Sequence, residues 1–164
     1  MIEKIINHAK NEGFEAAVLE TSKLEFDFSF RKYCEQNLCG NFGKSEYCPP
    51  LCPSAEDLKN IVLAHKNIIV LKSEHSISDI TDSGKIKVAQ SSHNAATLRL
   101  IEKLPHKISA LALASGEGIE VPNGVTAACL SAYCINVSQM AQSCNMSYDY
   151  KNSTLSLFGF ITLD

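Results

Sequence analysis

The sequence predicts a single α/β domain over residues 1–164, in which a mixed β-sheet has helices packed on it and a C-terminal antiparallel hairpin. Segments with the spacing of amphipathic helices alternate with short, wholly apolar segments that are typical of strands. A chain of 164 residues is long enough to bury one hydrophobic core. No internal repeat, low-complexity tract or linker divides it, so we expect one layered domain.

The first half of the chain contains two predicted helices and a buried strand. Apolar residues at positions 2, 5, 6 and 9 predict an amphipathic helix that stops near Gly13. Residues 16–26 are predicted to be extended, and residues 34–53 to form a loop rich in glycine and proline. Ser54 is a suitable N-cap for the next helix, with Glu56 and Asp57 in its first turn. The apolar, β-branched run 67–72 predicts a strand covered on both faces.

The second half repeats this alternation. A helix is predicted over about residues 88–104, and Pro105 marks its end. Residues 107–115 predict a second strand covered on both faces. Residues 116–124 form a turn-rich loop, and residues 125–144 are predicted to be helical. The tail from Met146 is predicted to be a hairpin that turns near Lys151 and Asn152, with residues 154–163 as its last strand.

Composition and charge exclude several classes of protein. The net charge is −3 and no run of Lys or Arg is present, which argues against binding nucleic acid. No apolar run approaches the ~20 residues that a bilayer requires, so no membrane association is expected. The N-terminal segment lacks the continuous apolar stretch of a signal peptide. We therefore expect a cytoplasmic protein whose thiols are reduced.

Four of the seven cysteines lie close together in the segment CEQNLCGNFGKSEYCPPLCP, residues 34–53. Their spacing is C-x4-C-x8-C-x3-C, formed by Cys34, Cys39, Cys48 and Cys52. A reducing compartment and an odd total of cysteines both argue against a disulfide framework. The spacing favours a metal site, either an iron–sulfur cluster or a zinc ion, with a redox-active thiol set as a further alternative.

Basic residues beside these cysteines are candidates for supporting roles. Arg31, Lys32 and Lys44 could help to hold the thiols deprotonated, since cations favour thiolates. If the protein is an enzyme, we expect Arg31 or Lys44 to orient an anionic substrate. We therefore predict Arg31 and Lys44 to be cofactor-binding residues.

The segment FRKYCEQNLCGNFGKSEYCPP resembles the opening signature of a family of predicted metal-binding proteins, domain of unknown function 2284. The family occurs largely in anaerobic bacteria and archaea. Its pattern is matched at Arg31, Cys34, Asn37, Cys39, Gly40, Phe42, Gly43, Lys44, Cys48, Pro49 and Pro50. The resemblance continues through the segments that follow, up to CLSAYCINV at residues 129–137. It favours an iron–sulfur cluster over zinc.

The chain departs from that family pattern in two places. Members usually carry a second, ferredoxin-type cysteine cluster after the strand that ends here at Ser115, where this chain has GEGIEVPNG. In the later segment, Ser131 and Asn136 stand where the family has carboxylates, and Cys134 stands where it has glycine. The resemblance thus implies a reduced member with one centre. Cys52 is less firmly part of the signature, and without it three thiolates would leave an iron open for catalysis.

The remaining candidates have more ordinary explanations. Cys129, Cys134 and Cys144 are predicted to share a helix and to pack in the core, although Cys129 at its start is the best of them for a fourth ligand or a resolving thiol. His93 shares an inward helix face with Thr97, so we expect a buried, hydrogen-bonded histidine. The GxG at 116–118 is predicted to be a plain turn.

Together these features predict a metal-binding protein, most readily one with a [4Fe-4S] cluster on Cys34, Cys39, Cys48 and Cys52. Its expected role is redox or electron transfer, or cluster-dependent catalysis, in anaerobic metabolism. Its expected partner is a redox protein or a small-molecule substrate. The alternative is a structural zinc module that serves a protein–protein interaction. Neither the reaction nor the oligomeric state follows from the sequence.

Overall fold

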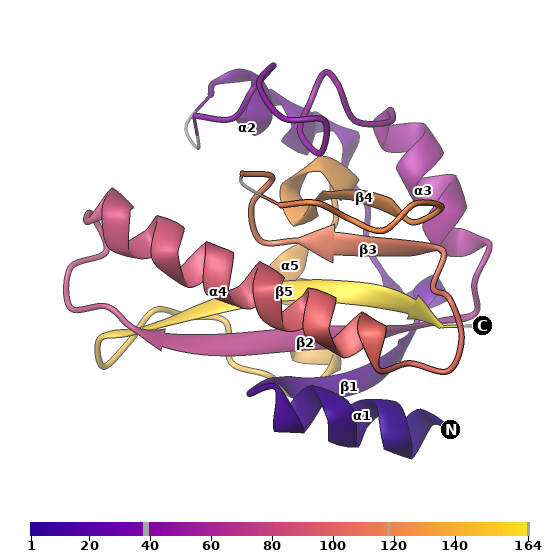
Figure 1. The fold of residues 1–164 in the computed structure, drawn as a ribbon. Coiled ribbons are helices and arrows are strands. Elements are labelled where there is room, and N and C mark those ends of the chain that lie inside the picture. The colour runs from indigo at the N-terminus through magenta and orange to yellow at the C-terminus, as the bar shows by residue number, and fades with distance from the viewer. Residues whose placement is uncertain (38–39, 118, 164) are drawn as a thin grey trace.

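The computed structural model describes residues 1–37, 40–117 and 119–163 and shows three layers, with helices on both faces of one β-sheet (Figure 1). The five strands are β1 (Glu15–Glu20), β2 (Asn67–Ser76), β3 (Ala110–Leu113), β4 (Thr126–Cys129) and β5 (Thr154–Leu163). They are arranged in the order β1-β2-β5-β3-β4. Strands β3 and β4 pair in parallel, and the other neighbours are antiparallel. The predicted mixed α/β sheet is confirmed.

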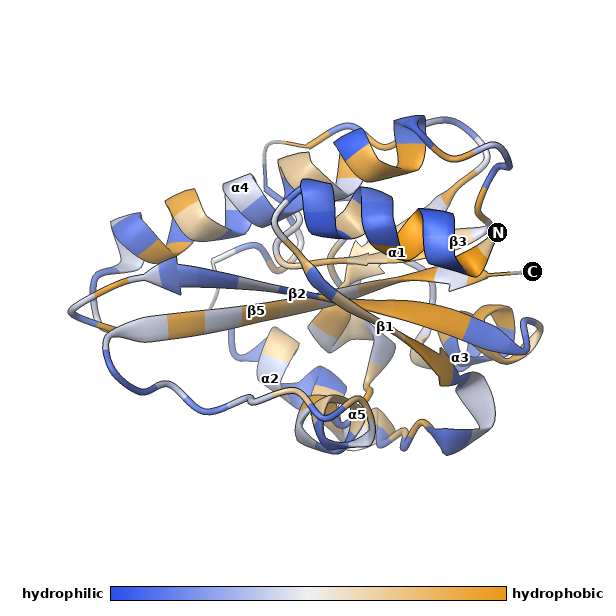
Figure 2. Ribbon diagram, turned by 90° about the horizontal axis from the view of Figure 1, so that it is seen from below, coloured by the Kyte–Doolittle hydropathy of each residue, from blue (hydrophilic) through white to orange (hydrophobic). Residues whose placement is uncertain are grey.

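The helices are divided between the two faces. The α-helices are α1 (Ile2–Asn11), α2 (Arg31–Glu35), α3 (Ala55–Leu63), α4 (Ser83–Glu102) and α5 (Val137–Ser143), and the short 3₁₀ helices are η1 (Thr21–Lys23), η2 (Phe28–Phe30) and η3 (Leu130–Tyr133). Figure 2 shows α1 and α4 on one side of the sheet and α2, α3 and α5 on the other. Each side of the sheet therefore has its own apolar core.

Strand β2 divides its side chains between these cores. Ile68 and Val70 pack with the α3 and α5 side, whereas Ile69 and Leu71 pack with the α1 and α4 side. All four are fully buried, as expected where successive side chains of a strand point to opposite faces. The prediction of a strand covered on both faces is confirmed.

Local sequence signals account for the helix ends. The Ser54 hydroxyl accepts a hydrogen bond of 3.1 Å from the backbone N–H of Asp57, which caps α3 as predicted.

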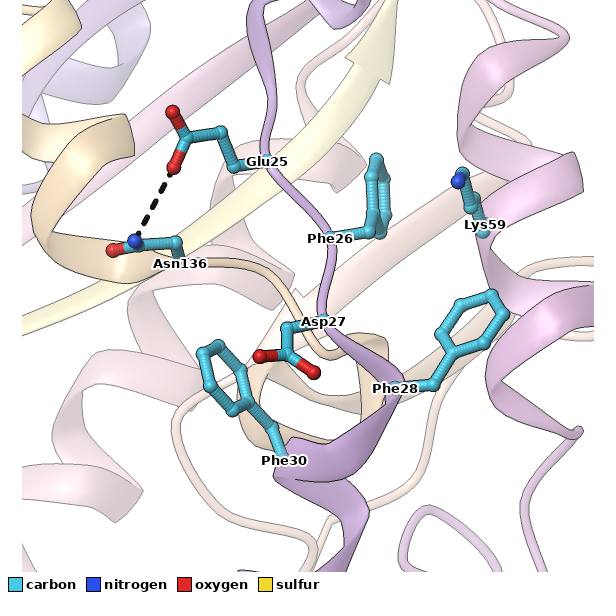
Figure 3. Close-up of a pocket in the computed structure, with 7 residues that line it drawn as sticks. All are labelled: Glu25, Phe26, Asp27, Phe28, Phe30, Lys59 and Asn136. Atoms are coloured by element: carbon cyan, nitrogen blue, oxygen red, sulfur yellow. Dashed lines mark hydrogen bonds between the residues drawn. The ribbon is translucent and has the colours of Figure 1, made fainter.

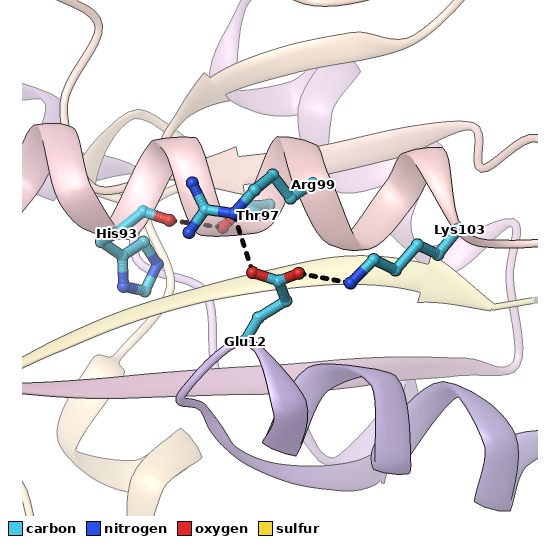
Figure 4. Close-up of polar contacts among 5 residues, drawn as sticks. All are labelled: Glu12, His93, Thr97, Arg99 and Lys103. Atoms are coloured by element: carbon cyan, nitrogen blue, oxygen red, sulfur yellow. Dashed lines mark hydrogen bonds and ion pairs between the residues drawn. The ribbon is translucent and has the colours of Figure 1, made fainter.

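Between α1 and α4, the Glu12 carboxylate accepts hydrogen bonds from Arg99 (2.8 Å) and Lys103 (2.6 Å), and this clamp ties the two helices together (Figure 4).

Two predicted elements near the C-terminus differ from the structure. The prediction of one helix over residues 125–144 is wrong, because residues 126–129 form β4 in parallel pairing with β3 and only residues 137–143 form α5. Between them Cys134 adopts a left-handed conformation with φ of +59°, which a continuous helix does not allow. A glycine would adopt the same backbone conformation at lower cost.

The C-terminal hairpin is reduced to a single bridge between Lys151 and Thr154. Strand β5 is antiparallel, as expected, but it lies between β2 and β3 in the middle of the sheet. The segment before it packs elsewhere, since the Tyr150 hydroxyl donates a hydrogen bond to the carbonyl of Ile77 at the end of β2. Strand β5 therefore pairs with β2 and β3 in the interior of the sheet and not with the segment just before it.

Within the described residues, no helix combines the length and the apolar composition that a membrane-spanning segment requires.

Candidate metal centre

The cysteine-rich loop lies against the ends of the two parallel strands. The backbone N–H of Cys129, the last residue of β4, donates a 3.0 Å hydrogen bond to the carbonyl of Tyr47. The Ser45 hydroxyl donates a 2.7 Å hydrogen bond to the carbonyl of Gly116, just beyond β3. The carboxyl ends of parallel strands are where open α/β sheets most often place a ligand. The loop is therefore held where such a sheet commonly places a ligand.

Five thiols of the described residues are buried, and four of them lie at or beside the loop, whereas the fifth, Cys134, follows η3. Cys34, Cys48, Cys52 and Cys129 each expose at most 7% of their surface. The Sγ atoms of Cys48 and Cys129 lie 3.1 Å apart, and the Cys34 thiol faces the Ser131 hydroxyl at 3.6 Å. Residues far apart in the sequence thus bring their sulfur atoms to the turn between β4 and η3.

Cys52 has different surroundings from the other three. Its side chain packs in the apolar core of the α3 side, together with Leu58, Val62 and Tyr133. Burial raises its pKa, Arg31 lowers it, and negative charge on Cys48 or Cys34 would raise it. The thiols are thus close enough for their charges to repel one another. Ionising several of them together requires a compensating cation, which a metal ion supplies.

The pKa of the Cys48 thiol is lowered by its neighbours. Its contact with Cys129 lowers the pKa of Cys48 to about 7, against the effect of burial. The neighbouring Ser45 side chain and the backbone N–H of Gly116 contribute to the same lowering of the pKa. A thiol with a lowered pKa is a better metal ligand, because the thiolate is the form that binds.

The predicted metal ligands are only partly placed. The structure brings Cys34, Cys48 and Cys52 into one region, whereas Cys39 lies outside the described residues. Among the side chains that the structure describes, no three His, Cys, Asp or Glu residues have the arrangement of a metal site. The donors in the region are all sulfur, which suits an iron–sulfur cluster or zinc rather than a hard cation.

The two predicted cofactor-binding residues have different environments. The Arg31 guanidinium donates hydrogen bonds to the carbonyls of Ala132 (2.9 Å) and Pro53 (2.6 Å), which tie α2 to the η3 turn and to the end of the cysteine loop. Burial raises the pKa of both Cys52 and Cys134, and the charge of Arg31 opposes that rise. Lys44 is exposed at the surface of the loop. Of the two predicted cofactor-binding residues, Arg31 is therefore the one whose positive charge lies beside the thiols.

Gly116 is a residue that the sequence did not single out for the site. A Cβ at this position would lie 2.6 Å from Cys48 Sγ and 2.7 Å from Ser45 Oγ, so only glycine lets the strand end approach the loop this closely. The GxG of residues 116–118 was the available signal, since glycine after a strand can mark a close backbone approach. Within the loop, Gly40 (φ +79°) and Gly43 (φ +73°) adopt the left-handed conformations expected of them.

His93 is buried as predicted, and its surroundings are now defined. Its Nδ1 lies 2.6 Å from the Ser73 hydroxyl, which also lies 2.8 Å from His75 Nε2. Its Nε2 has no hydrogen-bond partner among the described residues. The expectation of a hydrogen-bonded core histidine is thus met at one nitrogen only.

A separate cavity of about 620 Å³ opens beside α3 (Figure 3). It is lined by Glu25, Phe26, Asp27, Phe28, Phe30, Lys59 and Asn136. The Lys59 ammonium lies 5.2 Å from the ring centre of Phe26 and 5.5 Å from that of Phe28, so its own cation–π contacts occupy the aromatic wall. No cysteine lines this cavity, which is therefore distinct from the cysteine region.

Comparison with protein families gives a match that covers most of the chain. The profile described as predicted metal-binding protein (DUF2284) matches residues 17–119. The chain belongs to the DUF2284 family. The resemblance inferred from residues 30–50 is thereby confirmed, and the DUF2284 match includes all four cysteines of the loop, whereas Cys129 lies beyond it. Searches of curated proteins and of solved structures found no match.

Proposed function

We propose that this DUF2284 protein binds a [4Fe-4S] cluster through Cys34, Cys39 and Cys48 and a fourth thiol buried beside them. The observation that carries this proposal is the gathering of buried thiols around one loop that the family match includes. The donor set is entirely sulfur, Arg31 supplies a nearby positive charge, and Gly116 N–H donates to a sulfur. Such hydrogen bonds and charges tune iron–sulfur clusters.

When bound, the cluster would supply one-electron transfer or, at an iron without a protein ligand, Lewis acidity. The residues of the chain would exclude water from the sulfurs and hold them by the contacts described above. We place the protein in a reducing compartment such as the cytoplasm, in a redox or cluster-dependent catalytic role in anaerobic metabolism. Its partner would be a redox protein or a small anionic substrate.

A structural zinc ion is a second candidate, favoured by one distance. Two thiolates that each lie ~2.3 Å from one tetrahedral zinc ion are ~3.8 Å apart. The 3.1 Å between Cys48 Sγ and Cys129 Sγ is shorter than this separation but close to it. One ion could therefore be reached by both sulfurs with little rearrangement.

Metal analysis after anaerobic purification tests both candidates. For one [4Fe-4S] cluster we expect about four iron and about four acid-labile sulfide ions per chain. The protein should be brown, and its visible absorption should bleach on reduction. A colourless protein with one zinc per chain would replace the cluster with the second candidate. A protein free of both metals after reconstitution would refute a metal-binding role. The variant Cys34→Ser should lose the metal, whereas Cys144→Ser, on the half-buried thiol after α5, should retain it.

A further inference from the structure

We propose that Cys129 is the fourth thiolate ligand of the centre and that Cys52 is a core residue. This inference rests on the proposed function, in that a metal centre must exist on the loop. It names a ligand outside the family-matched residues and outside the cysteine-rich segment itself.

The backbone fixes Cys129 beside the loop. Its N–H donates a hydrogen bond to the carbonyl of Tyr47. Because Cys48 follows Tyr47 in the chain, this bond brings Cys129 next to Cys48. The two Sγ atoms come within 3.1 Å, and both residues are buried, at 3% and 7% exposure. Because Cys129 ends β4, the parallel pairing with Leu113 of β3 also holds its position.

A second thiol of the loop is directed to the same turn. Cys34, on α2, faces Ser131 at 3.6 Å, and Ser131 is only two residues beyond Cys129. Arg31, on the same helix, donates to Ala132 of η3 and so holds α2 against this turn. The turn from β4 into η3 is therefore where Cys34 and Cys48, which come from opposite ends of the loop, converge.

Cys52 is placed for packing instead. Its side chain belongs to the apolar cluster that contains Leu58, Val62 and Tyr133. Tyr133 is fully buried, and its hydroxyl donates to the carbonyl of Leu111, so the group beside Cys52 is anchored to the sheet. A small buried cysteine among such neighbours behaves as an ordinary apolar residue.

The test compares three serine variants purified without air: Cys129→Ser, Cys52→Ser and Cys144→Ser as the matched control. We expect Cys129→Ser to hold less than half of the wild-type metal per chain and to lose the remainder to a chelator at least tenfold faster. Cys52→Ser and Cys144→Ser should match the wild type in both measurements. The reverse result, in which Cys52→Ser loses the metal and Cys129→Ser keeps it, would overturn the assignment. Wild-type protein without metal would refute the proposed function itself.

A measurement on the wild type covers the case in which Cys129→Ser fails to fold. Alkylation rates at each cysteine are compared by mass spectrometry in metal-loaded protein and in protein treated with a chelator. We expect alkylation of Cys129 to be at least tenfold faster after metal removal, with no change at Cys144. Equal rates at Cys129 in both forms, or a Cys48–Cys129 disulfide in metal-loaded protein, would overturn the inference.

Discussion

Acidification is expected to destabilise the fold through His93. This histidine lies on α4 with 1% of its surface exposed, and its ring packs edge-on against Phe14 at 5.1 Å between centres. Burial lowers the pKa of His93 from 6.5 to about 3, and the nearby His75 adds to the effect. The folded protein therefore keeps this ring neutral at pH values where the unfolded chain protonates it.

The size of the effect follows from proton linkage. Between the two pKa values the unfolded state binds one more proton than the folded state, so the stability from a neutral His93 is complete above the unfolded pKa and falls as the pH is lowered toward about 3. Each pH unit well inside this window costs about 1.4 kcal/mol. Near its own pKa the unfolded chain is only partly protonated, so the first part of the decrease in pH has a smaller effect. Lowering the pH from about 7 to about 5 should therefore reduce the free energy of unfolding by about 2 kcal/mol.

Urea unfolding of metal-free protein at several pH values measures this loss directly. The variant His93→Gln removes the titrating group while leaving a donor that can reach Ser73, and its stability should fall much less over the same range. His106→Gln, on an exposed histidine after α4, is the matched control and should keep the wild-type pH dependence. A wild-type stability that does not change across this range, or an equal fall in His93→Gln, would refute the reasoning.

Three further predictions concern single contacts. Gly159→Ala would place a Cβ 2.6 Å from the carbonyl oxygen of Ala112 on β3, so overpacking should cost about 1–3 kcal/mol in urea unfolding; an unchanged midpoint would contradict it. Gly116→Ala would place a Cβ 2.6 Å from Cys48 Sγ, so we expect its metal content to fall while metal-free stability changes less than in Gly159→Ala; full metal content would count against the close approach. Glu12→Gln should lower the thermal midpoint by an amount that shrinks with added salt, because hydrogen bonds and charge from two cations of α4 hold the pKa of that carboxyl down. A midpoint equal to the wild type at low salt would argue that the clamp is not stabilising.

The sequence alone predicted the layered α/β fold and the family signature at residues 30–50. The spacing of apolar residues predicted α1, α3, α4 and strand β2, which is covered on both faces. Burial on one or both faces of an element produces such a pattern in the local sequence. Three of the four cysteines at positions 34–52 are buried and lie in one region, and their role as metal ligands stays a prediction. Their spacing and the glycines between them are local properties, so no tertiary information was needed to find them.

Tertiary structure decided the features that depend on pairing between distant segments. Residues 126–129 form a strand because β3 is available to pair with them, and this placement brings Cys129 to Cys48 across 81 positions of the chain. The burial of β5 between β2 and β3, and the need for glycine at position 116, have the same origin. Local propensity cannot specify such contacts, since they form only when the whole sheet excludes water and satisfies its backbone hydrogen bonds.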